Sequence, residues 1–163
     1  MADISIRKFN SLVRAKAFIL NGVKALTSAT FTASKQHAGR TTVISDVDGG
    51  TITLPASSGS GLKFRFVLGS TLTSGTFVVK VANATDVFVG GVIINDIGDT
   101  TVATADFHPT AATSDTFTMT QSIGGGKQGD WVEFEDIKSG FWAVNGVMQG
   151  VTDPTSPFSA TVS

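Results

Sequence analysis

Apolar and polar side chains alternate over several short stretches of this chain. In residues 51–54 and 63–68, every second side chain is apolar. A period of two residues is typical of β-strands with one buried face. Turn sequences lie between these stretches, because Gly49 and Gly50 allow positive φ and the Pro-led loop over residues 55–61 bends the chain. This part of the chain therefore predicts short strands joined by tight turns.

The same alternation continues to residue 147, and no helical pattern interrupts it after residue 41. Short strands at regular intervals are typical of a β-sandwich or a jelly roll. We therefore expect an all-β chain with one jelly-roll-like sandwich domain over residues 41–150 and an extended tail over residues 151–163. A hairpin is expected at residues 138–140, between two strongly alternating strands. The predicted strands are 41–47, 51–54, 63–68, 76–82, 86–94, 100–103, 116–120, 131–137 and 141–147.

The segment over residues 87–94 is apolar on both faces, apart from Gly90 and Gly91. A strand of this kind lies either inside a core or at a subunit interface. The low share of charged residues, 15%, suits a protein that buries much of its surface in an assembly. For the second alternative, the candidate interface residues are Val87, Val89, Val92 and Ile94.

Charge is distributed unevenly along the chain. Residues 1–40 hold seven lysines and arginines against Asp3 alone, so they carry +6, whereas residues 41–163 hold five basic and twelve acidic residues and carry −7. This division predicts a basic N-terminal arm over residues 1–40 that contacts an acidic partner. Helix-like apolar spacing over residues 5–20 predicts a short helix there, which either caps the β domain or reaches a neighbouring subunit. The candidate binding residues of the arm are Arg7, Lys8, Phe9, Arg14, Lys16 and Lys24.

The sequence favours a protein without catalytic chemistry. The absence of cysteine excludes disulfides, zinc-thiolate sites and cysteine nucleophiles. The only histidines, His37 and His108, have no acid spacing that indicates a metal site. Glu133 and Glu135 share one strand face, where neighbouring carboxylates usually form a solvated edge. We therefore predict no enzyme activity and no cofactor.

A few alternatives concern ligands. A calcium site at Asp46 and Asp48, or around Asp96 and Asp99, stays open because hard cations favour clustered oxygens. The glycine run before Lys127 lacks the remaining residues of a phosphate-binding loop. Nucleic acid is not expected, because the basic arm lacks a dense patch with stacking side chains. No apolar run reaches the length of a membrane span, so no membrane contact is expected.

Two segments resemble a known family. The segment HAGRTTVISDVDGGTITLPASSGSG (residues 37–61), followed by a hydrophobic strand, resembles the decoration or cement proteins of tailed-bacteriophage heads. The segment GDWVEFEDIKSGFWAVNG (residues 129–146) resembles the closing hairpin of the same proteins. The resemblance implies a trimer on the capsid exterior of the virion, assembled in the host cytoplasm. It would bind across subunits of the major capsid protein, and the family has no catalytic residues to carry over.

A second function is a carbohydrate- or receptor-binding β module of the virion, such as a head fibre or tail protein. Trp131 or Trp142 would then be the platform on which a sugar stacks. A solvent-exposed tryptophan beside polar groups favours this alternative, whereas two buried tryptophans favour the structural protein.

Overall fold

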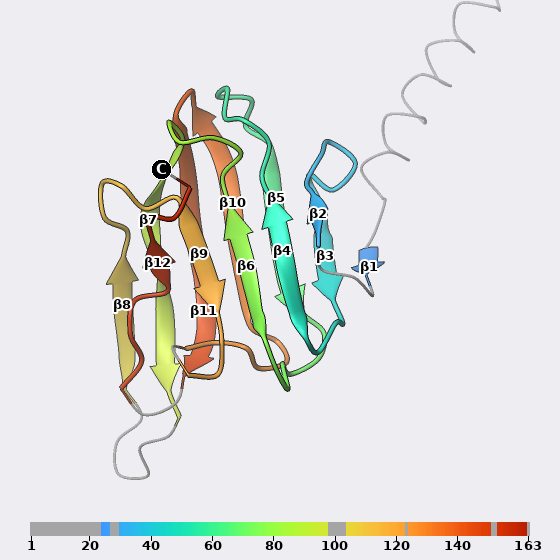
Figure 1. Ribbon diagram of the computed structural model, residues 1–163, viewed down its shortest axis with the longest axis vertical. Coiled ribbons are helices and arrows are strands. Elements are labelled where there is room, and N and C mark those ends of the chain that lie inside the picture. The colour runs from blue at the N-terminus through green and yellow to red at the C-terminus, as the bar shows by residue number, and fades with distance from the viewer. Residues whose placement is uncertain (1–23, 27–29, 98–103, 123, 151–152, 163) are drawn as a thin grey trace, which may run out of the picture.

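The structure is a computed structural model that describes residues 24–26, 30–97, 104–122, 124–150 and 153–162. All regular secondary structure in these ranges is β, and the strands form two sheets packed face to face (Figure 1). The β-sandwich predicted from the alternation is confirmed. The predicted helix at 5–20 and the predicted strand at 100–103 lie outside the described residues. Within the described ranges, no helix has the length and apolar character needed to cross a bilayer.

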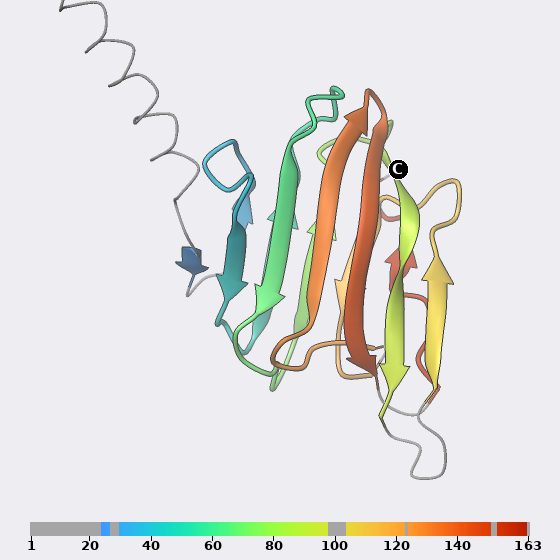
Figure 2. The ribbon, with the colours of Figure 1, turned by 180° about the vertical axis from the view of Figure 1, so that it is seen from behind.

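The two sheets have seven and five strands. Across the larger sheet the order is β1 (Lys24–Leu26), β3 (Thr41–Ile44), β5 (Lys63–Leu68), β10 (Trp131–Lys138), β11 (Phe141–Gly150), β7 (Val87–Asp96) and β8 (Ala105–Pro109). Across the smaller sheet it is β12 (Phe158–Ser159), β9 (Thr116–Met119), β6 (Thr76–Lys80), β4 (Gly49–Thr53) and β2 (Phe31–Thr32). Figure 2 shows the outer face of the larger sheet.

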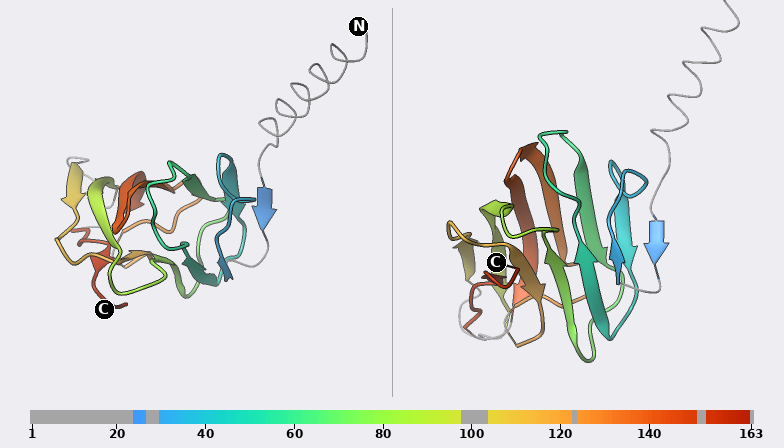
Figure 3. Two further views of the ribbon diagram at one scale, coloured as in Figure 1. Left: turned by 90° about the horizontal axis from the view of Figure 1, so that it is seen from above. Right: turned by 45° about the horizontal axis from the view of Figure 1, so that its top comes forward.

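From β1 to β6 the chain crosses between the sheets after every strand. Strands β1, β3 and β5 are parallel neighbours in one sheet, and β2, β4 and β6 are parallel neighbours in the other. The chain therefore winds in three stacked turns, as in a β-solenoid. Figure 3 shows the two layers of this winding from above. An antiparallel jelly roll has no such parallel turns, and the sequence did not predict them.

The second half of the chain adds mainly antiparallel pairs. Strands β10 and β11 form the hairpin predicted at residues 138–140, where Gly140 has a φ of 86°. Strand β10 also pairs antiparallel with β5, so the hairpin continues the sheet begun by the parallel turns. Strand β7 pairs in parallel with β11, and β8 completes that side of the sheet.

The core lies between the sheets and is rich in phenylalanine. Phe134 is fully buried, and its ring centroid lies 6.4 Å from Phe66, 4.9 Å from Phe88 and 5.9 Å from Phe117. Each buried side chain of this size contributes on the order of 1.5–3 kcal/mol. These aromatic contacts join strands from both sheets, so they hold the sandwich together.

The sandwich begins before the boundary predicted at residue 40. Ala33 is 2% exposed, and its backbone N–H donates to the carbonyl of Thr53 over 2.8 Å. Phe31 stacks on His37 at 4.8 Å and meets Phe66 at 6.5 Å. Residues 30–40 are therefore part of the β domain. The predicted division into arm and domain was placed too late in the chain.

The C-terminal residues also belong to the sandwich. Strand β12 pairs with β9, and the ring of Phe158 lies 5.5 Å from that of Phe117. The carboxylate of Asp115 accepts the backbone N–H groups of Thr161 and Val162. Residues 158–162 are therefore held to the sandwich by a neighbouring strand and a buried carboxylate.

Candidate binding site on the seven-stranded sheet

An apolar row crosses the outer face of the larger sheet. The strand registers place six side chains side by side, one from each of six neighbouring strands. Four are half-buried, while Ile93 is 41% exposed and Phe107 is 63% exposed. A contiguous apolar row on a solvent face is typical of an interaction surface. We call these residues the apolar row: Val43, Val67, Trp131, Val147, Ile93 and Phe107.

Charged residues lie beside the apolar row on β5 and β10, two and four positions from Val67 and Trp131. Arg65 on β5 is opposite Glu133 on β10, and Lys63 is opposite Glu135. The ammonium nitrogen of Lys63 lies 2.9 Å from a carboxylate oxygen of Glu135, and this hydrogen bond and charge raise the pKa of Lys63. Both bases lie on β5 and both acids lie on β10, so this part of the face carries positive and negative charges side by side.

The two tryptophans have different environments. Trp142 is fully buried in the core, and its indole nitrogen has no hydrogen-bond partner among the described residues. Trp131 is half-buried in the apolar row, and the guanidinium carbon of Arg65 lies 4.0 Å above its ring centroid. This cation–π contact occupies a ring face on which a sugar would stack. Neither tryptophan is therefore an open platform.

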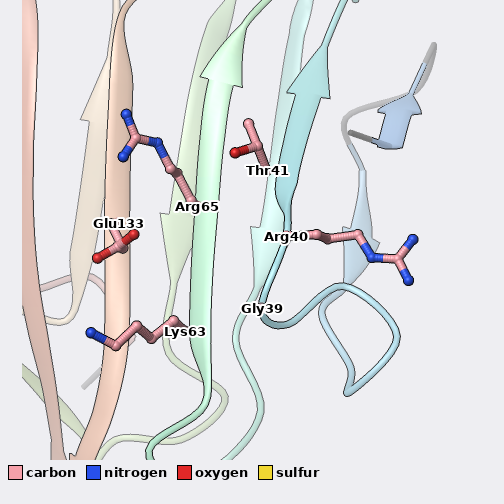
Figure 4. A pocket seen from close by; sticks show the side chains of 6 residues that line it. All are labelled: Gly39, Arg40, Thr41, Lys63, Arg65 and Glu133. Carbon is pink, nitrogen blue, oxygen red and sulfur yellow. The ribbon is translucent and has the colours of Figure 1, made fainter. Parts of the chain in front are cut away.

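A shallow hollow lies over the start of β3 and β5, with a volume of about 240 Å³ (Figure 4). Lys63 and Arg65 extend from β5 toward Glu133, whereas Arg40 extends in the opposite direction. A single carboxylate among three bases lacks the acid pair needed for glycoside hydrolysis. The hollow can attract negative charge, and it forms the basic margin of the outer face. Its lining is completed by Gly39 and Thr41.

The Ser/Gly loop over residues 55–61 is fixed by two buried carboxylates. Asp86 accepts the backbone N–H of Ser57 over 2.8 Å and its hydroxyl over 2.9 Å. Asp136 accepts backbone N–H groups of Ser58, Gly59 and Ser60 over 2.7–3.0 Å, together with both serine hydroxyls. Burial opposes ionisation of Asp136, but these hydrogen bonds outweigh it and hold its pKa below the usual range.

A third buried carboxylate lies at the other end of β10. Asp130 is 2% exposed and accepts the backbone N–H groups of Lys127 and Gln149 over 2.8 and 3.0 Å. Burial raises the pKa of Asp130 to about 6, although those two hydrogen bonds act in the opposite direction.

The burial of Asp136 could have been predicted from the alternation of β10, because Asp136 shares the inward positions with Val132 and Phe134. Asp136 was not among the residues predicted from the sequence.

The described residues contain no group of three or more histidine and acidic side chains placed to hold a metal ion. At the first candidate calcium site, Asp46 accepts the backbone N–H of Asp48, and Asp48 accepts the hydroxyl of Ser74. At the second, Asp96 is 6% exposed, while Asp99 lies outside the described residues. One carboxylate oxygen of Asp46 and one of Asp48 therefore accept hydrogen bonds within the fold.

The structure corrects the predicted subunit interface. Val92 and Ile94 are 1% and 0% exposed, because they face the core of their own chain. They cannot contact a second copy without opening the sandwich. Val87 and Val89 lie on the outer face and are half-buried, so they remain candidates. The sequence analysis missed Ile93, which is more exposed than either valine and lies in the apolar row.

The predicted arm residues are mostly outside the described part of the chain. This applies to Arg7, Lys8, Phe9, Arg14 and Lys16. Lys24 lies in β1, where its backbone is paired with that of Thr42, so it belongs to the edge of the larger sheet.

Comparison with known proteins identifies no relative, since no family model, curated protein or solved structure matches the chain. Any function must therefore be argued from the outer face of the larger sheet and from the sequence segments that build it.

Proposed function

We propose that this chain is a structural virion protein that decorates the outside of a tailed-phage capsid. It would stabilise the shell by binding across neighbouring subunits of the major capsid protein, as a trimer. The observation that carries the proposal is the apolar row, a broad binding surface with charged residues along one side. A protein that acts by adhesion needs a wide complementary surface rather than a deep cleft.

The two segments that resemble decoration proteins support the proposal, because both contribute strands to the larger sheet. Residues 37–61 include β3 and the fixed Ser/Gly loop, together with β4 of the smaller sheet, and residues 129–146 include β10 and most of β11. Strand β5 lies between β3 and β10 in the same sheet. Three of the four strands in the resembling segments, β3, β10 and β11, therefore belong to the sheet that carries the apolar row.

The rigidity of the body also suits a bracing role. The turn between β4 and β5 is a Ser/Gly sequence, yet Asp86 and Asp136 fix it with buried hydrogen bonds. A brace transmits load only if its loops do not yield. A specific interface buries roughly 1,200–2,000 Å² in total, and three linked copies would gain further through effective concentration.

The sugar-binding alternative has less support. Trp142 is buried, and Arg65 covers a face of Trp131. Arg65 would have to leave its ring contact before a sugar could stack there. No separate observation favours this function over adhesion.

The proposal predicts that a neighbouring gene encodes a major capsid protein, and shells assembled from that protein provide the test. Val147→Lys places a charge in the centre of the apolar row, whereas Val78→Lys makes the same change on the outer face of the smaller sheet. Both valines are half-buried, which makes the pair a matched control. We expect Val147→Lys to reduce shell binding at least tenfold and Val78→Lys to leave it unchanged. Wild-type protein that fails to bind these shells would refute the proposal, as would equal effects of the two variants.

A further inference from the structure

Among the described residues, the larger sheet ends at β8, which pairs with β7 on one side only (Figure 2, the yellow strand at the edge). Exposed apolar side chains gather here. Phe107 is 63% exposed, Ile97 is 51% exposed and Ile93 is 41% exposed. An open edge strand beside exposed apolar residues is a template for pairing with another chain.

Gly91 has no side chain and so leaves space for the ring of Phe107 on the outer face. A β-carbon added to Gly91 would lie 2.5 Å from the ring of Phe107, so only glycine leaves room for the ring in this place. The ring crosses from β8 onto β7 beside Ile93, its partner in the register. Phe107 therefore extends the apolar row to the edge of the sheet and presents it there.

The hydrogen bonds of β8 show which backbone groups face outward. The backbone N–H of Thr110 donates to the carbonyl of Gly90 over 3.0 Å, and the backbone N–H of Asp96 donates to the carbonyl of Thr104 over 2.8 Å. In an antiparallel ladder such bonded pairs recur at every second residue. The even-numbered residues of β8 therefore bond to β7. The N–H and carbonyl groups of Ala105 and Phe107, and the carbonyl of Pro109, face the open edge.

We propose that two copies of this chain join through their β8 strands, paired antiparallel about a two-fold axis at Phe107. In this register each Phe107 exchanges two hydrogen bonds with Phe107 of the second copy. Each Ala105 donates to the carbonyl of Pro109 of the second copy. The apolar rows of the two copies then meet at the seam, and Phe107 and Ile93 lose much of their exposure.

Charge complementarity supports a second copy as the partner. The same register places Asp106 directly opposite His108 of the second copy, and the two-fold axis repeats this pair. An acid opposite an imidazole is a favourable cross-strand pair, whereas two acids opposite each other would repel.

Pro109 limits the pairing to a short segment. Proline has no N–H, so it cannot donate across the seam and it ends the ladder. In the proposed register Pro109 is needed only as an acceptor. A contact this short joins folded copies without inviting an extended stack of strands.

The seam would add to the proposed function without depending on it. On a shell it would connect copies that belong to neighbouring trimers, since each trimer would present three β8 edges. It would form in isolated protein as well. A failure to bind capsids would therefore leave the seam intact, and loss of the seam would leave shell binding through the apolar row to be tested separately.

The natural chain has no cysteine, so single cysteines report the register directly. Bonded partners in an antiparallel pair have α-carbons about 5.5 Å apart, within the range of roughly 4.4–6.8 Å that a disulfide requires. We expect Phe107→Cys to form a disulfide-linked dimer under mild oxidation. Ala105→Cys is the control, because its two copies would lie about 14 Å apart at about 3.4 Å per residue.

A second experiment keeps Phe107 in place. Chains with Ala105→Cys and chains with Pro109→Cys should cross-link when mixed, whereas Ala105→Cys alone should not. Phe107→Lys in the cysteine-bearing chains should abolish this product, and Ile137→Lys, at a 48% exposed position on β10, should not. Absence of the mixed product would overturn the proposal. Equal cross-linking of Ala105→Cys alone would overturn it too. So would a mixed cross-linked product that forms only when a host lysate is added, because the partner of β8 would then be another protein.

Discussion

The carboxylate of Asp136 is expected to be one of the most important single groups for the stability of the fold. It is 2% exposed and accepts hydrogen bonds from five donors on Ser58, Gly59 and Ser60. Asp136→Asn keeps the size of the side chain but removes the charge and one acceptor oxygen. The new amide N–H₂ group would face backbone N–H groups that themselves need an acceptor.

The size of the effect follows from these donors. A hydrogen bond to a charged group contributes about 1.5–3 kcal/mol, and a buried donor left without an acceptor costs about 1–3 kcal/mol. The asparagine leaves at least one backbone N–H unsatisfied and weakens the remaining bonds. We expect a loss of about 3–5 kcal/mol, a large part of the roughly 5–15 kcal/mol of a typical domain.

Urea unfolding followed by tryptophan fluorescence measures this loss, since Trp142 is buried in the core. With a slope near 2 kcal/mol per molar urea, the midpoint should fall by about 2 M. Glu135→Gln is the control, because Glu135 precedes Asp136 in the chain but makes only a solvent-accessible ion pair with Lys63. Exposed pairs contribute only about 0–1 kcal/mol.

The pH dependence gives a second check on the same group. Because the folded pKa of Asp136 is lowered, its stabilisation is present above the unfolded pKa of about 3.9 and is lost as the pH falls below it. The difference between the wild-type and Asp136→Asn midpoints should therefore shrink progressively as the pH falls below about 3.9, and it should vanish only when the pH passes the lowered folded pKa. A midpoint at pH 7 within 0.5 M of that of Glu135→Gln, by the same ~2 kcal/mol per molar slope, would show that the reasoning is wrong.

Three further predictions use the same assay. Because burial raises the pKa of Asp130 to about 6, stability should fall by roughly 2 kcal/mol as the pH rises from 4 to 7, and Asp130→Asn should remove this slope. Phe134→Ala should cost about 3–5 kcal/mol because it opens the aromatic core, whereas the exposed Ile137→Ala should cost under about 0.5 kcal/mol. A chain that begins at residue 24 should fold cooperatively, and one that begins at residue 41 should not, since it lacks Phe31 and Ala33.

The strands could be predicted because their alternation is local. Lys63–Leu68 was predicted with the observed bounds, and its inward residues Phe64, Phe66 and Leu68 are all buried. Strands β1, β2 and β12 were missed, since two or three residues carry too little pattern, and β8 was missed because its five residues do not alternate between buried and exposed. Their pairing depends on residues far along the chain, such as Phe158 against Phe117.

The parallel winding could not be predicted for a different reason. Alternation tells which face of a strand is buried, but both sheets bury a face in the same core. Thr41–Ile44 and Gly49–Thr53 have similar patterns, yet they lie in different sheets. The choice between a hairpin and a crossover depends on the turn between them, where Gly49 has a φ of 85° and leaves no room for a β-carbon beside Thr76. That close approach exists only after β6 is in place.

The candidate binding surface is a property of register, which explains why the sequence analysis found so little of it. Val43, Trp131 and Phe107 are each unremarkable in their own strands, where they occupy outward positions among polar neighbours. They become a surface only because the registers of successive strand pairs bring them onto one line. A shift of one residue in any pair would turn the strand over and break the row. The buried carboxylates help to prevent that shift: Asp136 fixes one end of β10 through the Ser/Gly loop, and Asp130 fixes the other through Gln149 on β11. Binding and stability are thus coupled through β10, and a change that loosens either aspartate should weaken the apolar row before it unfolds the chain.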